Sequence, residues 1–168
     1  MSKVLQKNLW WSFFITVISV IYAVVYTALP LAQHTMWCTY ISVPLFFLYK
    51  GDSKEIPSIA LNIILGFVWG LICMHFTNLT LHLGLYPAIS IGVFISVMGA
   101  CVVHMGVGVG TIFEKCPVAF ATFACCFANG GKHPEIVCGT MIFGLLLGIS
   151  FLATEQWAKT IVGLESEE

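Results

Sequence analysis

Hydrophobic positions fill six stretches of the chain, which run approximately over residues 10–31, 35–49, 56–75, 85–104, 116–129 and 134–154. A helix needs about 20 apolar residues to cross the hydrocarbon core of a bilayer. The stretches over 35–49 and 116–129 are shorter than that, and each follows an interruption, at Pro30 in one case and at Gly106, Gly108 and Gly110 in the other. The pattern predicts an all-α, polytopic membrane protein with six transmembrane helices.

Composition supports a lipid environment. Of the 168 residues, 59% are hydrophobic and 9% charged, against roughly 25% charged in an ordinary soluble domain. The net charge of −1 argues against a nucleic-acid partner, which requires a basic surface. The chain contains no arginine, so bidentate capture of phosphate or carboxylate is not available. We therefore expect the lipid bilayer as a partner, and a small neutral or weakly basic solute rather than an organic anion.

Lysines indicate the orientation. If the N-terminus is cytoplasmic, six of the seven lysines lie on the cytoplasmic side, namely Lys3, Lys7, Lys50, Lys54, Lys115 and Lys159, and Lys132 lies outside. This bias follows the positive-inside rule and predicts that both termini are cytoplasmic. The first apolar stretch is too long for a typical signal peptide and lacks a clear cleavage site, so we expect an uncleaved first span.

The two halves of the chain align with each other at an offset of 78 residues. The sequence Asn62-x-x-x-Gly66-x-x-x-Gly70 then matches Thr140-x-x-x-Gly144-x-x-x-Gly148, and the break at Pro30 matches the break at 106–110. Because each half contains three spans, the second half is inverted relative to the first. We predict three-helix repeats over 1–84 and 85–168, the second followed by a short acidic tail. Few residues are identical, and chance similarity between two glycine-rich apolar halves is the alternative.

Two sets of residues are candidates for packing and for function. Gly66, Gly70, Gly144 and Gly148 form small-xxx-small faces, so we expect the third and sixth spans to pack closely on each other or on a neighbouring subunit of a homo-oligomer. Backbone that leaves the helix at membrane depth must be satisfied by protein or by a water-filled cavity, and polar side chains there are functional candidates. The candidate pore-lining residues are His104, Tyr26, Asn62, Thr140, Pro30, Gly106, Gly108 and Gly110. For the glycine run, an ordinary interfacial loop is the alternative.

Catalytic and metal-binding patterns are not found in the sequence. It contains no Gly-x-Ser-x-Gly elbow, no His-Glu-x-x-His and no paired carboxylates in an apolar stretch. The seven cysteines include no Cys-x-x-Cys motif, so we interpret them as small packing residues. We therefore expect no enzymatic activity, no cofactor and no metal.

The Gly-x-Gly-x-Gly run at 106–110, the Asn129-Gly130-Gly131 turn before Pro134-Glu135 and the size with six spans resemble a family of small bacterial inner-membrane proteins of unknown function, the YcdZ-type proteins. The resemblance implies a location in the bacterial inner membrane and brings no established activity. The plan of two inverted halves also looks like that of aquaporins and formate channels, but no Asn-Pro-Ala motif is present.

Two functions remain open from the sequence. The first is a channel or facilitative transporter for a small neutral or weakly basic solute, with the passage lined near the two breaks. The alternative is a non-transporting membrane subunit or scaffold that binds partner helices through its glycine faces.

Overall fold

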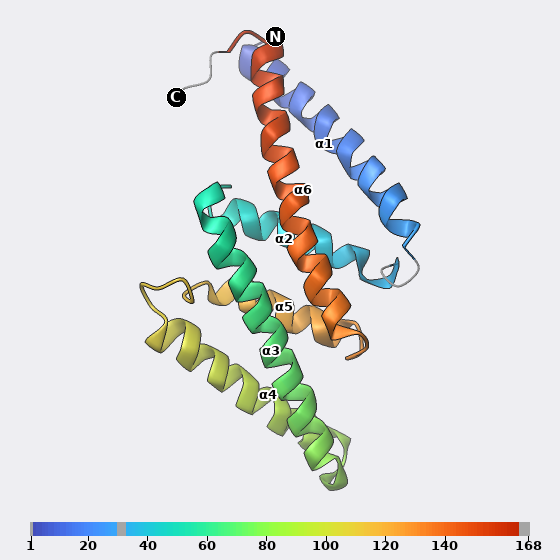
Figure 1. The fold of residues 1–168 in the computed structure, drawn as a ribbon, viewed down its shortest axis with the longest axis vertical. Helices are drawn as coiled ribbons and strands as arrows, with labels where there is room; N and C mark the ends of the chain where they lie inside the picture. Colours follow the sequence, from blue (N-terminus) through green and yellow to red (C-terminus); the bar gives the residue numbers. More distant parts are fainter. Residues whose placement is uncertain (1, 30–32, 165–168) are drawn as a thin grey trace.

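The computed structural model describes residues 2–29 and 33–164, which are helical throughout apart from short turns. The helices are α1 (Lys3–Thr27), α2 (Met36–Leu48), α3 (Ile56–Thr80), α4 (Leu85–Cys101), α5 (Cys116–Ala128) and α6 (Pro134–Ile161) (Figure 1). Single 3-10 turns precede α2, α3 and α4, and a π-helical segment, η4 (Val102–Val107), continues α4. The described residues contain no β-strand, so the chain is all-α as expected.

Four helices are long and apolar enough to cross a membrane: α1, α3 with its flanking turns, α4 with η4, and α6. The chain is therefore a membrane protein by length and composition. The short helices α2 and α5 have 13 residues each, which at about 1.5 Å per residue is well below the ~30 Å of the hydrocarbon core. The prediction of six spans thus holds for four full-length helices, and α2 and α5 occupy the two short stretches that the sequence indicated.

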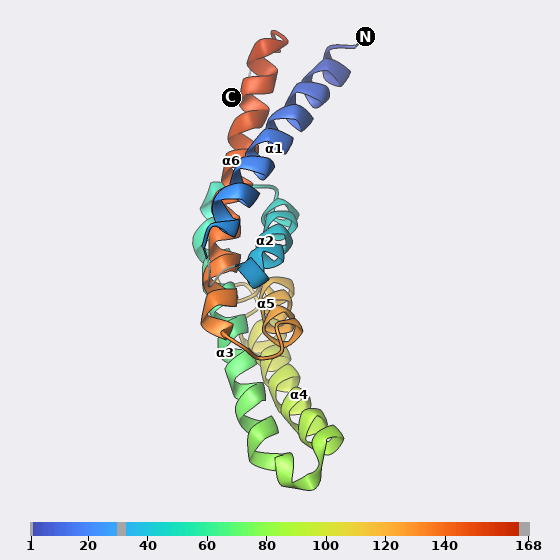
Figure 2. The same cartoon turned by 90° about the vertical axis from the view of Figure 1, so that its right-hand side faces the viewer.

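Helices α3 and α6 are the central helices of the fold, and the short helices α2 and α5 cross the middle of the molecule (Figures 1 and 2). Helix α2 packs against α6 and α5 packs against α3, whereas α1 lies along α6 and α4 lies along α3. The start of α1 and the end of α6 lie together at one end of the molecule, and the α3–α4 hairpin forms the other end. Each of the central helices α3 and α6 therefore packs against one short helix and one long outer helix.

The hydrophobic core lies where α2, α3, α5 and α6 cross. Its fully buried side chains include Phe46, Ile59, Ile63, Val137 and Met141. Helix α1, in contrast, buries a single side chain among its 25 residues, Tyr26. Outer helix α1 thus exposes much of its apolar surface, as a lipid-facing helix does.

Glycines allow α3 to approach α5 closely. A Cβ atom at Gly66 would lie 2.2 Å from the carbonyl oxygen of Ala119, and one at Gly70 would lie 3.2 Å from Cβ of Cys126. No side chain fits at the first position, because real Cβ atoms essentially never approach backbone oxygen that closely. The absence of a side chain is therefore what sets the α3–α5 distance.

The second pair of glycines has the same role between α6 and α2. A Cβ atom at Gly144 would lie 2.7 Å from the carbonyl oxygen of Thr39, and one at Gly148 would lie 2.8 Å from the ring of Phe46. The sequence led us to expect that these faces pack the third and sixth spans on each other or on a neighbouring subunit. Each glycine face instead receives a short helix from the other half of the chain, because α2 and α5 cross beside the two central helices.

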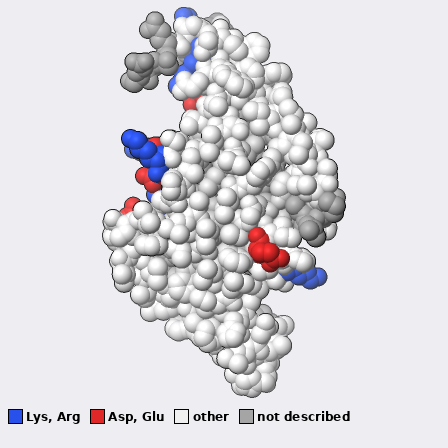
Figure 3. All heavy atoms as spheres, in the orientation of Figure 1, with Lys and Arg blue, Asp and Glu red and all other residues white. Residues whose placement is uncertain are grey.

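Charged side chains occupy a small part of the face shown in Figure 3, and uncharged residues cover most of the rest. Several of them form ion pairs: Lys7 with Glu155 at 3.0 Å and Lys115 with Glu55 at 2.7 Å. The second pair is unexpected from the sequence, since the Lys115 side chain is only 5% exposed and its ammonium lies 3.9 Å from the centre of the Tyr49 ring. Lys115 therefore fastens the start of α5 to the α2–α3 turn.

Candidate functional site

Two buried polar clusters lie at the ends of the outer helices. The first, here the Tyr26 cluster, consists of Tyr26, Thr35 and Thr140, which come from the end of α1, the turn before α2, and α6. The Tyr26 hydroxyl lies 2.5 Å from Oγ1 of Thr140 and 3.3 Å from Oγ1 of Thr35, and the two threonine oxygens are 3.1 Å apart. All three residues are buried. The cluster therefore joins both halves of the chain through a triangle of hydroxyl groups.

The hydroxyl groups of the triangle can both donate and accept hydrogen bonds. Each hydroxyl has one proton to donate and two lone pairs that accept. Tyr26 and Thr140 each contact two other hydroxyl oxygens, so each oxygen keeps a lone pair for a further bond. A molecule with an N–H or O–H group can therefore donate to this cluster.

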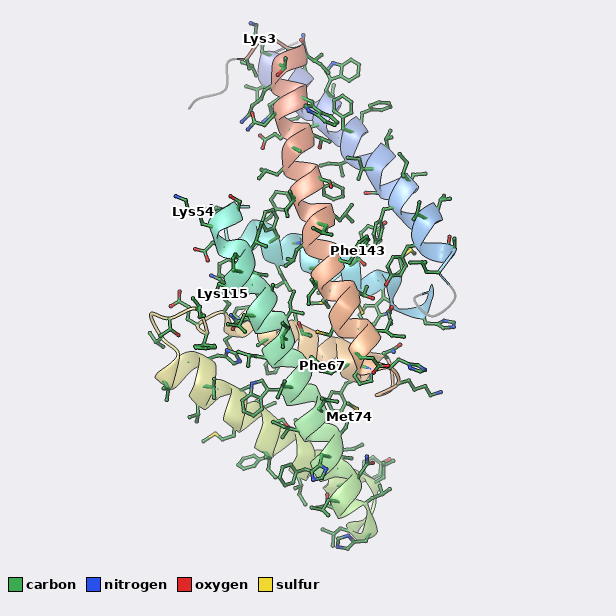
Figure 4. All side chains as sticks on the ribbon, viewed as in Figure 1. Lys3, Lys54, Phe67, Met74, Lys115 and Phe143 are labelled. Atoms are coloured by element: carbon green, nitrogen blue, oxygen red, sulfur yellow. The ribbon has the colours of Figure 1, made fainter. Side chains whose placement is uncertain are left out.

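Aromatic rings form a wall beside the Tyr26 cluster. The ring of Tyr22 lies 5.3 Å from that of Tyr26 and stacks at 5.7 Å on Phe143 of α6, which is labelled in Figure 4. The Tyr22 hydroxyl is hydrogen-bonded to Thr39 of α2 at 2.5 Å. These contacts hold the end of α1 against α6 and α2, and they position the aromatic faces.

A groove runs between α1 and α6 past these rings. One section has a volume of about 290 Å³ and is lined by Tyr22, Tyr26 and Phe143 together with aliphatic side chains of both helices. A second section of about 270 Å³ shares Tyr26 and Phe143 and reaches Thr140. The two sections therefore meet at the Tyr26 cluster.

The second cluster, here the His104 cluster, lies where η4 meets α3. Nδ1 of His104 lies 2.6 Å from the carbonyl oxygen of Phe113, and Nε2 lies 3.3 Å from the indole Nε1 of Trp69. A carbonyl only accepts and an indole N–H only donates. In this arrangement Nδ1 of His104 donates to Phe113 and Nε2 accepts from Trp69. π-Helical segments such as η4 are frequent at functional sites.

Asn62 belongs to the same cluster through the neighbouring carbonyl. Its Nδ2 donates to the carbonyl oxygens of Ser58 and Ile112, both at 2.7 Å, and the Ser58 hydroxyl also donates to Ile112 at 2.8 Å. The Asn62 side chain is fully buried, and its Oδ1 has no hydrogen-bond partner. Here too the remaining hydrogen-bonding capacity is that of an acceptor.

The sequence-predicted polar residues are thus brought together in two pairs. Tyr26 contacts Thr140 directly, and His104 and Asn62 hold the carbonyls of adjacent residues in the turn before α5. Each pair combines the end of an outer helix with a central helix of the other half. Thr35, Ser58, Trp69 and Tyr22 were not among the candidates, since nothing in their local sequence distinguishes them from ordinary helix residues.

The glycine run forms a surface turn. A Cβ atom at Gly106 or Gly110 would meet nothing within 4 Å, whereas Gly108 packs against Phe113. Gly110 has a φ of 75°, and its N–H donates to the Glu114 carboxylate at 2.9 Å. The run therefore spans the end of η4 and the turn after it, and the amide groups of Gly108, Val109 and Gly110 are satisfied locally. A role in lining a passage stays a prediction. Pro30 lies outside the described residues.

The cysteines are free thiols, and five of them are buried in the helix crossings. Within residues 2–29 and 33–164, no group of three or more histidine, cysteine or acidic side chains could hold a metal ion.

Comparison with known families identifies the family of this chain. Residues 5–159 match the family described as "Protein of unknown function (DUF1097)". The chain therefore belongs to this family, as the resemblance to proteins of unknown function indicated. No curated protein and no solved structure matches the chain.

Proposed function

We propose that this protein is a channel or facilitative transporter for a small neutral or weakly basic solute, located in a bacterial inner membrane. The observation that carries the proposal is the pair of buried polar clusters, each at the junction between the two halves of the chain. Secondary transporters and channels built from inverted repeats bind their solutes at such junctions, near helix breaks. Polar side chains are costly inside a bilayer and are typically retained for function.

The packing supports two inverted repeats over 1–84 and 85–168. Buried positions of α3 recur 78 residues later in α6: Ile59 and Val137, Asn62 and Thr140, Ile63 and Met141, Gly66 and Gly144, Gly70 and Gly148. Buried positions of α2 recur 80 residues later in α5: Cys38 and Val118, Thr39 and Ala119, Ser42 and Thr122, Val43 and Phe123, Phe46 and Cys126. The two registers, together with the equivalent pairings of α5 with α3 and α2 with α6, favour a common ancestry of the halves over chance similarity.

The lysines support a common cytoplasmic side for both termini. Lys3 lies where the start of α1 meets the end of α6, and Lys54 and Lys115 lie on one flank of the molecule (Figure 4). Each of these three sites is a helix end that six crossings would place on one side of the membrane. In this orientation α2 and α5 also cross, at the waist of the fold, and Lys132 lies outside.

The chemistry of the clusters supports an uncharged or weakly basic solute. Both clusters offer acceptor oxygens, on Tyr26, Thr140 and Asn62, and neither contains a lysine. An anion would find no cationic side chain in either cluster, and passage of a hydrogen-bond donor requires no covalent step. We propose that the protein acts without catalysis, cofactor or metal.

The scaffold alternative is less well supported. In that alternative, the glycine faces bind helices of a partner protein. However, these faces already pack against α5 and α2 of the same chain, at Gly66, Gly70, Gly144 and Gly148. A homo-oligomer remains part of the proposal, supported by the apolar surface of α1, where a single side chain is buried.

Flux into liposomes tests the proposal. The purified protein is reconstituted, and the permeability to ammonia, methylamine, urea and glycerol is compared with that of protein-free liposomes. We expect a raised permeability to at least one of these solutes, reduced by Tyr26→Phe and by His104→Ala. His34→Ala, at an exposed position, is the matched control and should change nothing. Unchanged permeability for the whole panel would contradict the proposal.

A further inference from the structure

The α1–α6 groove has the shape of a site for an elongated molecule. Its lining on α6 extends from Ile136 to Ser150, a helix length of roughly 20 Å at 1.5 Å per residue. Its walls are almost entirely apolar and include Val25 of α1, Leu29 just after the end of α1, and Phe143 of α6. Grooves of this kind hold ligands through an apolar body and a small number of fixed polar contacts.

The polar contacts of the groove lie at the Tyr26 cluster and at Ser150. The Ser150 hydroxyl donates to the carbonyl oxygen of Leu146 at 2.9 Å, so it too presents an acceptor. Tyr26 and Thr140 are only 4% and 3% exposed, although both line the groove. A ligand therefore meets the Tyr26 cluster near one end of the groove, Ser150 at the other, and aliphatic or aromatic surface between them.

We infer that the α1–α6 groove binds an uncharged amphipathic molecule with an aliphatic body and a single hydroxyl or amine group, which enters from the bilayer. The inference rests on the proposed function and names the class of solute for its Tyr26–Thr140 end. The hydroxyl or amine donates to the oxygen of Tyr26 or Thr140. The groove lining contains no charged side chain, so a permanently charged molecule would be desolvated there without compensation.

A lipid acyl chain is the competing occupant of the apolar section. It would fill the groove without using the acceptors at the Tyr26 cluster. A hydrogen-bond donor distinguishes the two occupants, because a ketone of the same length has the same apolar body and only an acceptor oxygen.

The test uses photolabelling of the full chain in lipid nanodiscs with 3-azioctanol, a diazirine-bearing alcohol, followed by peptide mapping. We expect labels on α1 and α6 at residues that line the groove. Added as a competitor, 1-octanol should suppress labelling at a roughly two- to tenfold lower concentration than 2-octanone. This difference in affinity corresponds to one neutral hydrogen bond. Thr140→Val keeps the side-chain shape and should remove the difference, whereas Thr160→Val, at an exposed position of α6, should preserve it.

Equal competition by the alcohol and the ketone in the wild-type chain would overturn the inference and favour an acyl chain as occupant. Labels spread evenly over α1, α4 and α6 would overturn it as well. The experiment measures binding and not flux, so its failure leaves the liposome result standing. Binding without flux would count against the proposed transport only.

Discussion

Replacing Gly66 by alanine tests the close helix contact on which the fold depends. The added methyl group would lie 2.2 Å from the carbonyl oxygen of Ala119 and 2.8 Å from Cβ of Thr122. Overpacking of a core typically costs about 1–3 kcal/mol, and this clash is with backbone that cannot rotate away. The higher helix propensity of alanine offsets up to about 1 kcal/mol of this cost. With a clash at the upper end of the range, we expect the free energy of unfolding to fall by about 2 kcal/mol.

The matched control for this change is Gly139→Ala. Gly139 lies inside α6, and a Cβ atom there would meet nothing within 4 Å, so the variant should be neutral or up to about 1 kcal/mol more stable. The free energy of unfolding is measured in mixed micelles by circular dichroism at increasing denaturing detergent. If Gly66→Ala and Gly139→Ala unfold at the same detergent fraction, the proposed tight α3–α5 contact is refuted.

Three further predictions follow from the same contacts. Gly144→Ala should destabilise the chain about as much as Gly66→Ala, because its Cβ would also meet a backbone carbonyl; a neutral effect in the same unfolding assay would argue against equivalent halves. Tyr26→Phe should cost about 1 kcal/mol through the lost hydroxyl contacts, whereas Tyr86→Phe, at a side chain that is 83% exposed, should leave the unfolding transition unchanged. Glu55→Gln should lower the free energy of unfolding by about 1–2 kcal/mol, since it leaves the buried ammonium of Lys115 without its carboxylate. Lys115→Met should be less destabilising, and the reverse order would show that the ion pair does not hold this turn.

The sequence predicted most of the helices because long apolar stretches leave few alternatives. Helix ends were less well predicted: α1 begins at Lys3 rather than near residue 10, since Ser2 caps it by accepting from the Leu5 N–H at 3.3 Å, and α6 continues to Ile161, where Lys7 pairs with Glu155. Polar residues at helix ends interrupt the apolar pattern, although the helix continues through them.

Four of the candidate residues, Tyr26, Thr140, His104 and Asn62, lie in the two buried clusters, but their pairing was not predicted. The alignment offset of 78 residues matches Tyr26 with His104 and Asn62 with Thr140, but it misaligns the short helices, whose buried positions are 80 residues apart. A shift of two residues in the turns around α2 and α5 therefore hides the equivalence of these short helices from an ungapped comparison. Partners such as Thr35 and Trp69 come close only through the crossing of helices, which no local pattern encodes.

The side of the membrane on which the α3–α4 turn lies tests the inverted arrangement most directly. If α2 and α5 cross the bilayer, this turn is on the opposite side from both termini, whereas with α1, α3, α4 and α6 as the only crossings it is on the same side. The measurement is labelling of His82→Cys by a membrane-impermeant maleimide in intact cells, with the partly exposed Cys101 and Cys116 replaced by serine. The account predicts labelling from outside at position 82, with Asp52→Cys protected until the membrane is opened. Protection at position 82 together with labelling at position 52 would contradict it.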